Sequence, residues 1–395
     1  MSIQLNTKDK LEDPDASHIY VDLDIVNNDW VGVNLPKTLT FNEIRNNPYI
    51  LKPNKYFFSV VRFQLDTPTL PVFIPIIEPN QGNKDKTIYK VAITYGGNEY
   101  VESVYWTSSS FQAVYPTEPV GPSQELNEYY YCYCYQNFLN MINERLKTIL
   151  TSIPGKPAAD ISPPTFTYDA PTNALKFHAD SRYFINGAFT TPTAGTFSVY
   201  VNGPLQRLLA GFDWYDYGLP VPNPASTPLQ YRLRVYETFN NLENRKTPPN
   251  LLTSNYDVIM TSEQLDTALW NPIKSLVFAS GLIPVLPTLT SPPKALDGTY
   301  LSSFGNNSNL STQITDFEVG FSVNNTYKNT ITYVPSGEYR LIDITSDIPL
   351  NSLDISVYWK DAYGNLNPFR LASACSGNLK LLFRRKDFNN TAYLN

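Results

Sequence analysis

The pattern of apolar and polar residues along the chain is mainly that of β-strands. Residues 19–26 read Ile-Tyr-Val-Asp-Leu-Asp-Ile-Val, an alternation typical of a strand with one buried face. Residues 56–65 are rich in β-branched and aromatic side chains, which favours a strand buried over much of its length. A Gly-Gly turn between two such runs predicts a hairpin over residues 87–106. Further strands are predicted at residues 165–180 (a hairpin), 196–202, 231–239, 273–285, 329–345, 353–366 (a hairpin) and 378–386.

One segment departs from this pattern and predicts a helix. Over residues 138–150 the apolar positions Phe138, Ile142, Leu146 and Ile149 recur at helical spacing, with charged Glu144 opposite them. Such a stripe indicates an amphipathic helix with one face against the core.

Two cysteines lie just before this helix, in the stretch Tyr-Cys-Tyr-Cys-Tyr at residues 131–135. If this stretch is a strand, its period of two places both thiols on one face and the tyrosines on the other. A two-cysteine metal site needs two further ligands, and neither Cys375 nor the two histidines supplies a recognisable spacing. The sequence therefore favours packing of Cys132 and Cys134 as small apolar side chains.

Prolines divide the chain into expected regions. Residues 1–35 have few apolar positions apart from the strand at 19–26, and we expect an N-terminal arm. The densest proline cluster lies at residues 218–228 and predicts a domain boundary or an inter-sheet crossover. We therefore expect a first β-rich unit with the helix at 36–225 and a second β-rich unit at 226–395, because one core rarely serves a chain of 395 residues.

Composition supports an all-β fold and argues against several functions. Charged residues are 17% of the chain, aromatics 14%, and tyrosine (28) far exceeds methionine (3), which favours strands over helices. The net charge of −6 gives no overall attraction for nucleic acid or anionic membrane. No window approaches 18 uninterrupted apolar residues, and the polar N-terminus lacks the apolar core of a signal peptide, so we expect no membrane span and synthesis in the cytosol.

Catalytic signatures are missing from the sequence. Only two histidines are present, which removes the usual base or ligand of most hydrolase and metalloenzyme mechanisms. No phosphate-binding loop, dinucleotide fingerprint, nucleophile elbow or zinc motif occurs. We expect no enzyme activity, no cofactor, no metal ion and no small-molecule ligand.

A loop rich in aromatic residues is the main candidate for binding. Trp214, Tyr215 and Tyr217 lie close together, as is common in protein interfaces, and the same rings could stack on a sugar. Two carboxylates in the same loop, Asp213 and Asp216, leave a glycosidase as a third reading, although nothing fixes them at a catalytic separation. A second carboxylate pair, Asp22 and Asp24, lies on one face of a strand that we expect to be exposed.

A basic run near the C-terminus is a weaker candidate. It consists of Lys380, Arg384, Arg385 and Lys386. These side chains could contact an acidic partner or the genome, or simply be hydrated at the end of a strand, since four charges without a longer arm are a weak signal for nucleic acid.

Several segments resemble the jelly-roll capsid proteins of non-enveloped viruses, of the kind found in polinton-like viruses and virophages. They are YFFSVVRFQLDTPTLPVFIP, FSVYVNGPLQRLLAGF, and EYRLIDITSDIPLNSLDISVYWKDAYGNLNPFRL with the ending LKLLFRRK. They span about the central and C-terminal two-thirds of the chain, and no functional residue transfers from the resemblance.

The resemblance implies a structural capsid protein that joins copies of itself and other capsid subunits in an icosahedral shell, as a penton, a minor or a small major capsid protein. We therefore expect one or two jelly rolls, a location in the virion and synthesis in the host cytoplasm. Weak contact with the genome is left open. The alternative is a carbohydrate-binding or adhesion module that uses the loop around Trp214.

Overall fold

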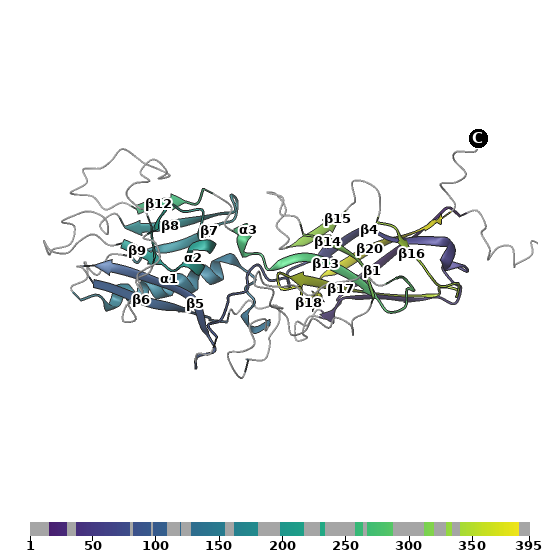
Figure 1. Ribbon diagram of the computed structural model, residues 1–395, viewed down its shortest axis with the longest axis horizontal. Helices are drawn as coiled ribbons and strands as arrows, with labels where there is room; N and C mark the ends of the chain where they lie inside the picture. Colours follow the sequence, from purple (N-terminus) through teal and green to yellow (C-terminus); the bar gives the residue numbers. More distant parts are fainter. Residues whose placement is uncertain are drawn as a thin grey trace, which may run out of the picture. The chain divides into compact units, whose positions relative to one another are not determined.

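The chain forms two compact units in a computed structural model (Figure 1). The structure describes residues 16–29, 37–79, 82–95, 98–108, 119, 128–154, 162–180, 198–216, 230–233, 257–263, 267–286, 312–319, 329–333 and 340–386. Unit 1 combines Met1–Leu70 with Pro272–Asn395, and unit 2 is the intervening Pro71–Asn271.

The described residues of unit 1 form a β-sandwich with eight main strands. In chain order they are β1 (His18–Val26), β3 (Thr40–Ile44), β4 (Tyr56–Asp66), β13 (Ile273–Ser280), β14 (Thr312–Glu318), β15 (Thr330–Tyr333), β17 (Ser352–Asp361) and β20 (Ser376–Arg385). Short elements join them: β2 (Lys37–Thr38), a 3-10 helix at Pro53–Lys55, β16 (Ile342–Asp343), β18 (Leu366–Pro368) and β19 (Arg370–Leu371).

The order of the strands defines a jelly roll. One sheet runs β1-β20-β4-β15, and the other runs β14-β13-β17, with β3 on the far edge of β17. All of these pairs are antiparallel. Numbered along the chain, the first sheet contains strands one, eight, three and six, and the second contains strands five, four, seven and two. Two sheets of four strands with these long connections are the jelly-roll arrangement, so the fold predicted from the sequence is confirmed.

Aromatic side chains fill the space between the two sheets. Phe63 of β4 is about 1% exposed, and its ring centroid lies 5.1 Å from that of Phe278 of β13 and 5.2 Å from that of Phe317 of β14. Tyr333 of β15 stacks on the same ring at 5.4 Å. One side chain therefore joins both sheets, and its burial excludes water from the centre of the sandwich.

The hairpin predicted at residues 353–366 is present. Gly364 adopts a φ of 80° between β17 and β18, a conformation that suits glycine because it has no Cβ. The buried carboxylate of Asp361 accepts hydrogen bonds from the backbone amides of Tyr363 and Asn365, both at 2.8 Å. The turn is thus held by a side chain as well as by the strands.

Unit 2 combines two sheets with the long helix. One sheet runs β10-β11-β9-β5-β6 and the other runs β12-β8-β7. The strands are β5 (Lys86–Tyr95), β6 (Asn98–Tyr105), β7 (Thr165–Asp169), β8 (Ala174–Asp180), β9 (Ser198–Val201), β10 (Trp214–Asp216), β11 (Tyr231–Leu233) and β12 (Asp257–Thr261). The helices are a 3-10 turn at Glu128–Tyr130, α1 (Tyr135–Ser152), α2 (Gly203–Leu208) and α3 (Thr267–Trp270).

Helix α1 confirms the prediction for residues 138–150 and packs against β5, β6 and β7. Its polar residues also complete the edge of β7. Asn143 accepts a hydrogen bond from the amide of Phe166 at 2.7 Å and donates to its carbonyl at 2.8 Å, and Gln136 accepts from the amide of Tyr168 at 2.8 Å. Because an uncovered edge strand can pair with other chains, these bonds protect β7.

The stretch around the two cysteines is not the predicted strand. Cys132 forms only an isolated bridge with Phe73, and Cys134 is the residue before α1. The period of two fails because the chain passes from a 3-10 turn into the helix, so Tyr130 and Tyr131 are buried as well. The expected packing holds for Cys132, which is fully buried, while Cys134 is half-buried.

The two units are divided differently from the expected 36–225 and 226–395. The first jelly-roll strands and the last ones belong to the same unit, so unit 2 is an insertion between β4 and β13. The strand at 19–26, expected in an arm, is β1 of the jelly roll. Residues 1–15, 30–36 and the proline cluster at 218–228 lie outside the described residues. The chain passes from one unit to the other at Pro71 and again at Pro272, so a proline marks each boundary. The denser proline cluster at 218–228 was a misleading signal by comparison.

We predict that Phe63→Ala lowers the free energy of unfolding by about 3–5 kcal/mol, because it leaves a cavity between the two sheets. Urea unfolding of the full-length protein measures this. As a control, Tyr363→Ala removes an aromatic ring that is 40% exposed and should change stability by less than about 0.5 kcal/mol. Equal effects of the two changes would contradict the described core.

Burial raises the pKa of the Cys132 thiol well above its usual range. We therefore predict that iodoacetamide at pH 8 modifies Cys134 before Cys132 in the folded protein, as peptide mass spectrometry would show. Since the folded pKa is raised, this thiol's contribution to stability is complete below about pH 8.5 and is lost as the pH rises further. Rapid modification of Cys132 without unfolding would show that its burial is wrong.

Candidate interaction surfaces

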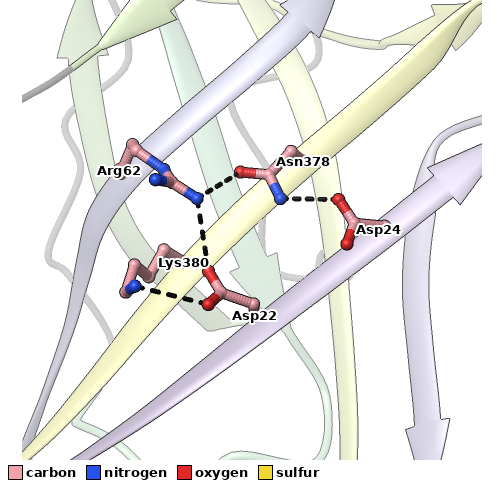
Figure 2. Close-up of polar contacts among 5 residues, drawn as sticks. All are labelled: Asp22, Asp24, Arg62, Asn378 and Lys380. Atoms are coloured by element: carbon pink, nitrogen blue, oxygen red, sulfur yellow. Dashed lines mark hydrogen bonds and ion pairs between the residues drawn. The ribbon is translucent and has the colours of Figure 1, made fainter.

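The outer face of the β1-β20-β4 sheet carries an ordered group of polar side chains (Figure 2). Strand alternation puts it there: Val21 and Leu23 of β1 point into the sandwich, while Asp22 and Asp24 point out. The register then sets Lys380 opposite Asp22 and Asn378 opposite Asp24. On the other side of β20, Arg62 of β4 lies opposite Lys380.

Five of these side chains are connected by hydrogen bonds and ion pairs, and we call them the polar network. Arg62 Nη2 donates to Asp22 Oδ1 at 3.3 Å and to Asn378 Oδ1 at 3.1 Å. Asn378 Nδ2 donates to Asp24 Oδ1 at 2.6 Å, and Lys380 Nζ lies 3.3 Å from Asp22 Oδ2. Figure 2 shows that the five side chains form one chain of contacts across three strands.

The charges of the polar network largely cancel, because it contains two cationic side chains and two carboxylates. The side chains of Arg62 and Asp22 are 43% and 47% exposed, so water screens their attraction. Such pairs add little to stability, and their effect is to fix the shape and the charge pattern of the face.

A shallow groove of about 390 Å³ adjoins the polar network. It is lined by Asp24, Ile25, Val26, Arg62, Gln64, Ser376, Gly377 and Asn378. Asp66, the last residue of β4, is linked to Ser376, the first residue of β20. Its Oδ2 accepts hydrogen bonds from the amide and the hydroxyl of Ser376 at 2.7 and 2.9 Å. Within the part of the chain that the structure describes, no three His, Cys, Asp or Glu side chains gather as a metal site.

The predicted aromatic loop is partly used inside unit 2. Trp214 is half-buried in β10 and donates its indole N–H to the Leu209 carbonyl at 2.8 Å. Arg232 of β11 covers the ring of Tyr215, with its guanidinium carbon 4.5 Å from the centroid. The other predicted member, Tyr217, lies outside the described residues. Neither described ring is therefore a bare platform for stacking a sugar.

The two carboxylates of that loop differ in their exposure. Asp216 is exposed and accepts a hydrogen bond from Gln230 at 3.1 Å. Asp213 is half-buried directly before β10.

Three of the four basic residues lie in β20, and Lys386 directly follows the last residue of that strand. Lys380 belongs to the polar network, about 13 Å from Arg384 along an extended strand. Arg384 and Arg385 are consecutive in β20 and point to opposite faces. Lys386 forms an ion pair with Asp343 at 2.8 Å. Lys380 and Lys386 thus each have a carboxylate partner.

Sequence reasoning missed Arg62 and Asn378 and placed Asp22 and Asp24 only on an exposed strand. The available signal was the shared alternation of residues 19–26 and 378–386. It did not reveal that these two strands, at opposite ends of the chain, pair with each other. Among the described residues, no helix is long and apolar enough to cross a membrane.

A jelly roll whose outer face carries a balanced polar network, with no metal site among the described residues, belongs to an architecture shared by viral capsid proteins and lectins. Comparison with known proteins decides between these classes. The family described as Sputnik minor capsid protein V18/19 matches residues 19–385, and the chain belongs to this family. It is thus a structural protein of a viral capsid, and the comparisons give no support to the carbohydrate-binding alternative.

Two relatives come from the Sputnik virophage. The uncharacterized protein V18 is 35% identical over 119 residues, which are 29% of this chain and 71% of that protein. The structural protein V19 is 24% identical over 235 residues, which are 57% of this chain and 95% of that protein.

Two solved structures share the fold over nearly the whole chain. A chain in the 3.5 Å cryo-EM structure of the Sputnik virophage has a TM-score of 0.73 and 26% identity, covering 94% of this chain and 99% of that one. The mavirus penton protein has a TM-score of 0.60 and 18% identity, covering 93% and 99%, and at this identity it shows the fold alone.

The alternation in β1 gives a direct test of the polar face. We predict that Asp22→Asn lowers the free energy of unfolding by less than about 1 kcal/mol, because its ion pairs are exposed. The adjacent Leu23→Ala should cost about 2–5 kcal/mol, because Leu23 points into the core and is 7% exposed. Urea unfolding of both variants measures the difference. A larger loss for Asp22→Asn than for Leu23→Ala would reverse the assigned faces.

Proposed function

We propose that the chain is the penton, the vertex subunit of an icosahedral virophage-type shell. The observation that supports this most is the architecture: a jelly roll with a second unit inserted between its third and fourth main strands. The mavirus penton protein shares the fold over 99% of its length, so the likeness includes both units.

In this role the chain contacts five-fold related copies of itself and neighbouring capsid subunits. A stable contact of this kind buries about 800 Å² on each partner. The outer faces of the jelly roll offer polar and aliphatic surfaces for such contacts, and the aromatic loop with Trp214 and Tyr215 is a further candidate in unit 2. We infer a purely structural role in the virion after synthesis in the host cytoplasm, without enzyme activity.

Genome contact through the basic residues is a weaker part of the proposal. Lys380 and Lys386 already have carboxylate partners. The four basic side chains together make a small electrostatic contribution, since no longer basic arm accompanies them among the described residues.

The proposal predicts that the purified full-length protein forms a pentamer without other capsid proteins. Size-exclusion chromatography with light scattering should give five times the 44.7 kDa mass of the chain. Negative-stain microscopy should show rings with five-fold symmetry. A trimer, or a monomer at every salt concentration and pH tested, would contradict the penton role while leaving the capsid family unchanged.

A further inference from the structure

One end of the jelly roll exposes aliphatic side chains. It is the end where β3, β13 and β20 finish and β4 and β17 begin, opposite the strand ends at which the chain leaves for unit 2 and returns. Four aliphatic residues there are more than half exposed, and we call them the apolar end: Ile44 (81%), Leu282 (53%), Leu286 (66%) and Ile348 (72%). Several exposed aliphatic residues at one end of a sandwich suit an interaction site.

The loop that presents Leu282 is held in place by one carboxylate. Asp354 of β17 accepts hydrogen bonds from the amide of Gly281 at 2.8 Å and from the amide of Leu282 at 2.9 Å, and also binds the hydroxyl of Ser280. The next residue, Ile283, is 2% exposed and anchors the loop in the core. Leu282 is therefore displayed by a fixed backbone, which reduces the entropy cost of binding a partner.

The segments that carry the other three residues are tied to one another. The amide of Thr345 donates to the Pro284 carbonyl at 2.9 Å, and Val285 forms a bridge with Ile344, which fixes the backbone that precedes Leu286 and Ile348. After Ile348 in the chain, Leu350 forms another bridge, with Ile50. The amide after Ile44, that of Arg45, donates to the Asn351 carbonyl at 2.9 Å.

Charges around the apolar end favour an acidic partner. The relevant described segments are residues 43–55, 280–286, 342–354 and 384–386. They contain six cationic side chains and four carboxylates: Arg45, Lys52, Lys55, Arg384, Arg385 and Lys386 against Glu43, Asp343, Asp347 and Asp354. Among these described segments the cationic side chains outnumber the carboxylates, although the whole chain carries −6. Complementary potential therefore selects a partner surface that carries carboxylates.

We propose that the apolar end docks an apolar segment, flanked by Asp or Glu, of a different capsid subunit. This inference rests on the proposed role as a vertex subunit and names the surface through which that subunit is held by the rest of the shell. A second copy of this chain is an alternative occupant, which the effect of Leu282→Asp on the pentamer tests below. Nucleic acid is a poorer match because it offers little to four aliphatic side chains.

The test uses the full-length protein and an array of overlapping 15-residue peptides from the other capsid proteins of the same virus. We expect the bound peptides to combine aliphatic residues with carboxylates, and their affinity to fall as salt is raised. In solution, Leu282→Asp combined with Ile348→Asp should weaken the best peptide at least about tenfold, because two buried aliphatic contacts are lost. Lys55→Glu should weaken it less.

The matched control is Leu269→Asp, which adds the same charge at a leucine of α3 that is 65% exposed, in unit 2. It should leave peptide binding unchanged. Thermal unfolding confirms that each variant is folded, and Leu286→Asp replaces the double variant if that one is not.

Unchanged binding in the double variant would overturn the inference, and so would bound peptides that lack carboxylates. Loss of the pentamer on Leu282→Asp would overturn it as well, because the apolar end would then be a contact between copies. Stronger binding to a single-stranded oligonucleotide than to any peptide would also overturn it. A wild-type protein that is monomeric but binds acidic apolar peptides would instead refute the penton role and retain the docking surface.

Discussion

The structure depends on the pairing of the last strand with the first. β20 lies between β1 and β4 and pairs with both along nearly its full length. The hydrogen bond between Asn378 and Asp24 joins residues 354 positions apart. Neither β1 nor the sheet as a whole is complete until the C-terminal residues are in place. The cost of closing so long a loop grows only slowly with its length, which explains how a unit of 201 residues fits between β4 and β13.

This closure also gives the two ends of the jelly roll different roles. At one end the chain leaves after β4 and returns before β13, so unit 2 is attached by two crossings. The other end presents the clamped loop with Leu282 and the segment with Ile348, together with the finish of β20. A sandwich that is rigid between its ends suits a shell protein, since contacts made at one position keep a fixed relation to contacts made at another.

Much of the fold could be predicted from local patterns. The alternation in residues 19–26, the helical spacing around Phe138 and the glycine at 364 each act over a few residues, and all three are present in the structure. The stretch around Cys132 was misjudged because a 3-10 turn feeding a helix leaves the same short apolar pattern as a strand. Pairing between distant strands has no local signature, so the inserted unit, the partner of Asp22 and the anchoring of Leu282 by Asp354 could not be predicted.

Amide hydrogen exchange on the purified full-length protein tests the central claim most directly. If β20 closes the jelly roll, the amides of β1, β4 and β20 exchange together, with one opening free energy, and respond together to Phe63→Ala. Rapid exchange of β20 beside protected β1 and β4 would contradict the account, because the last strand would then not hold the sheet together.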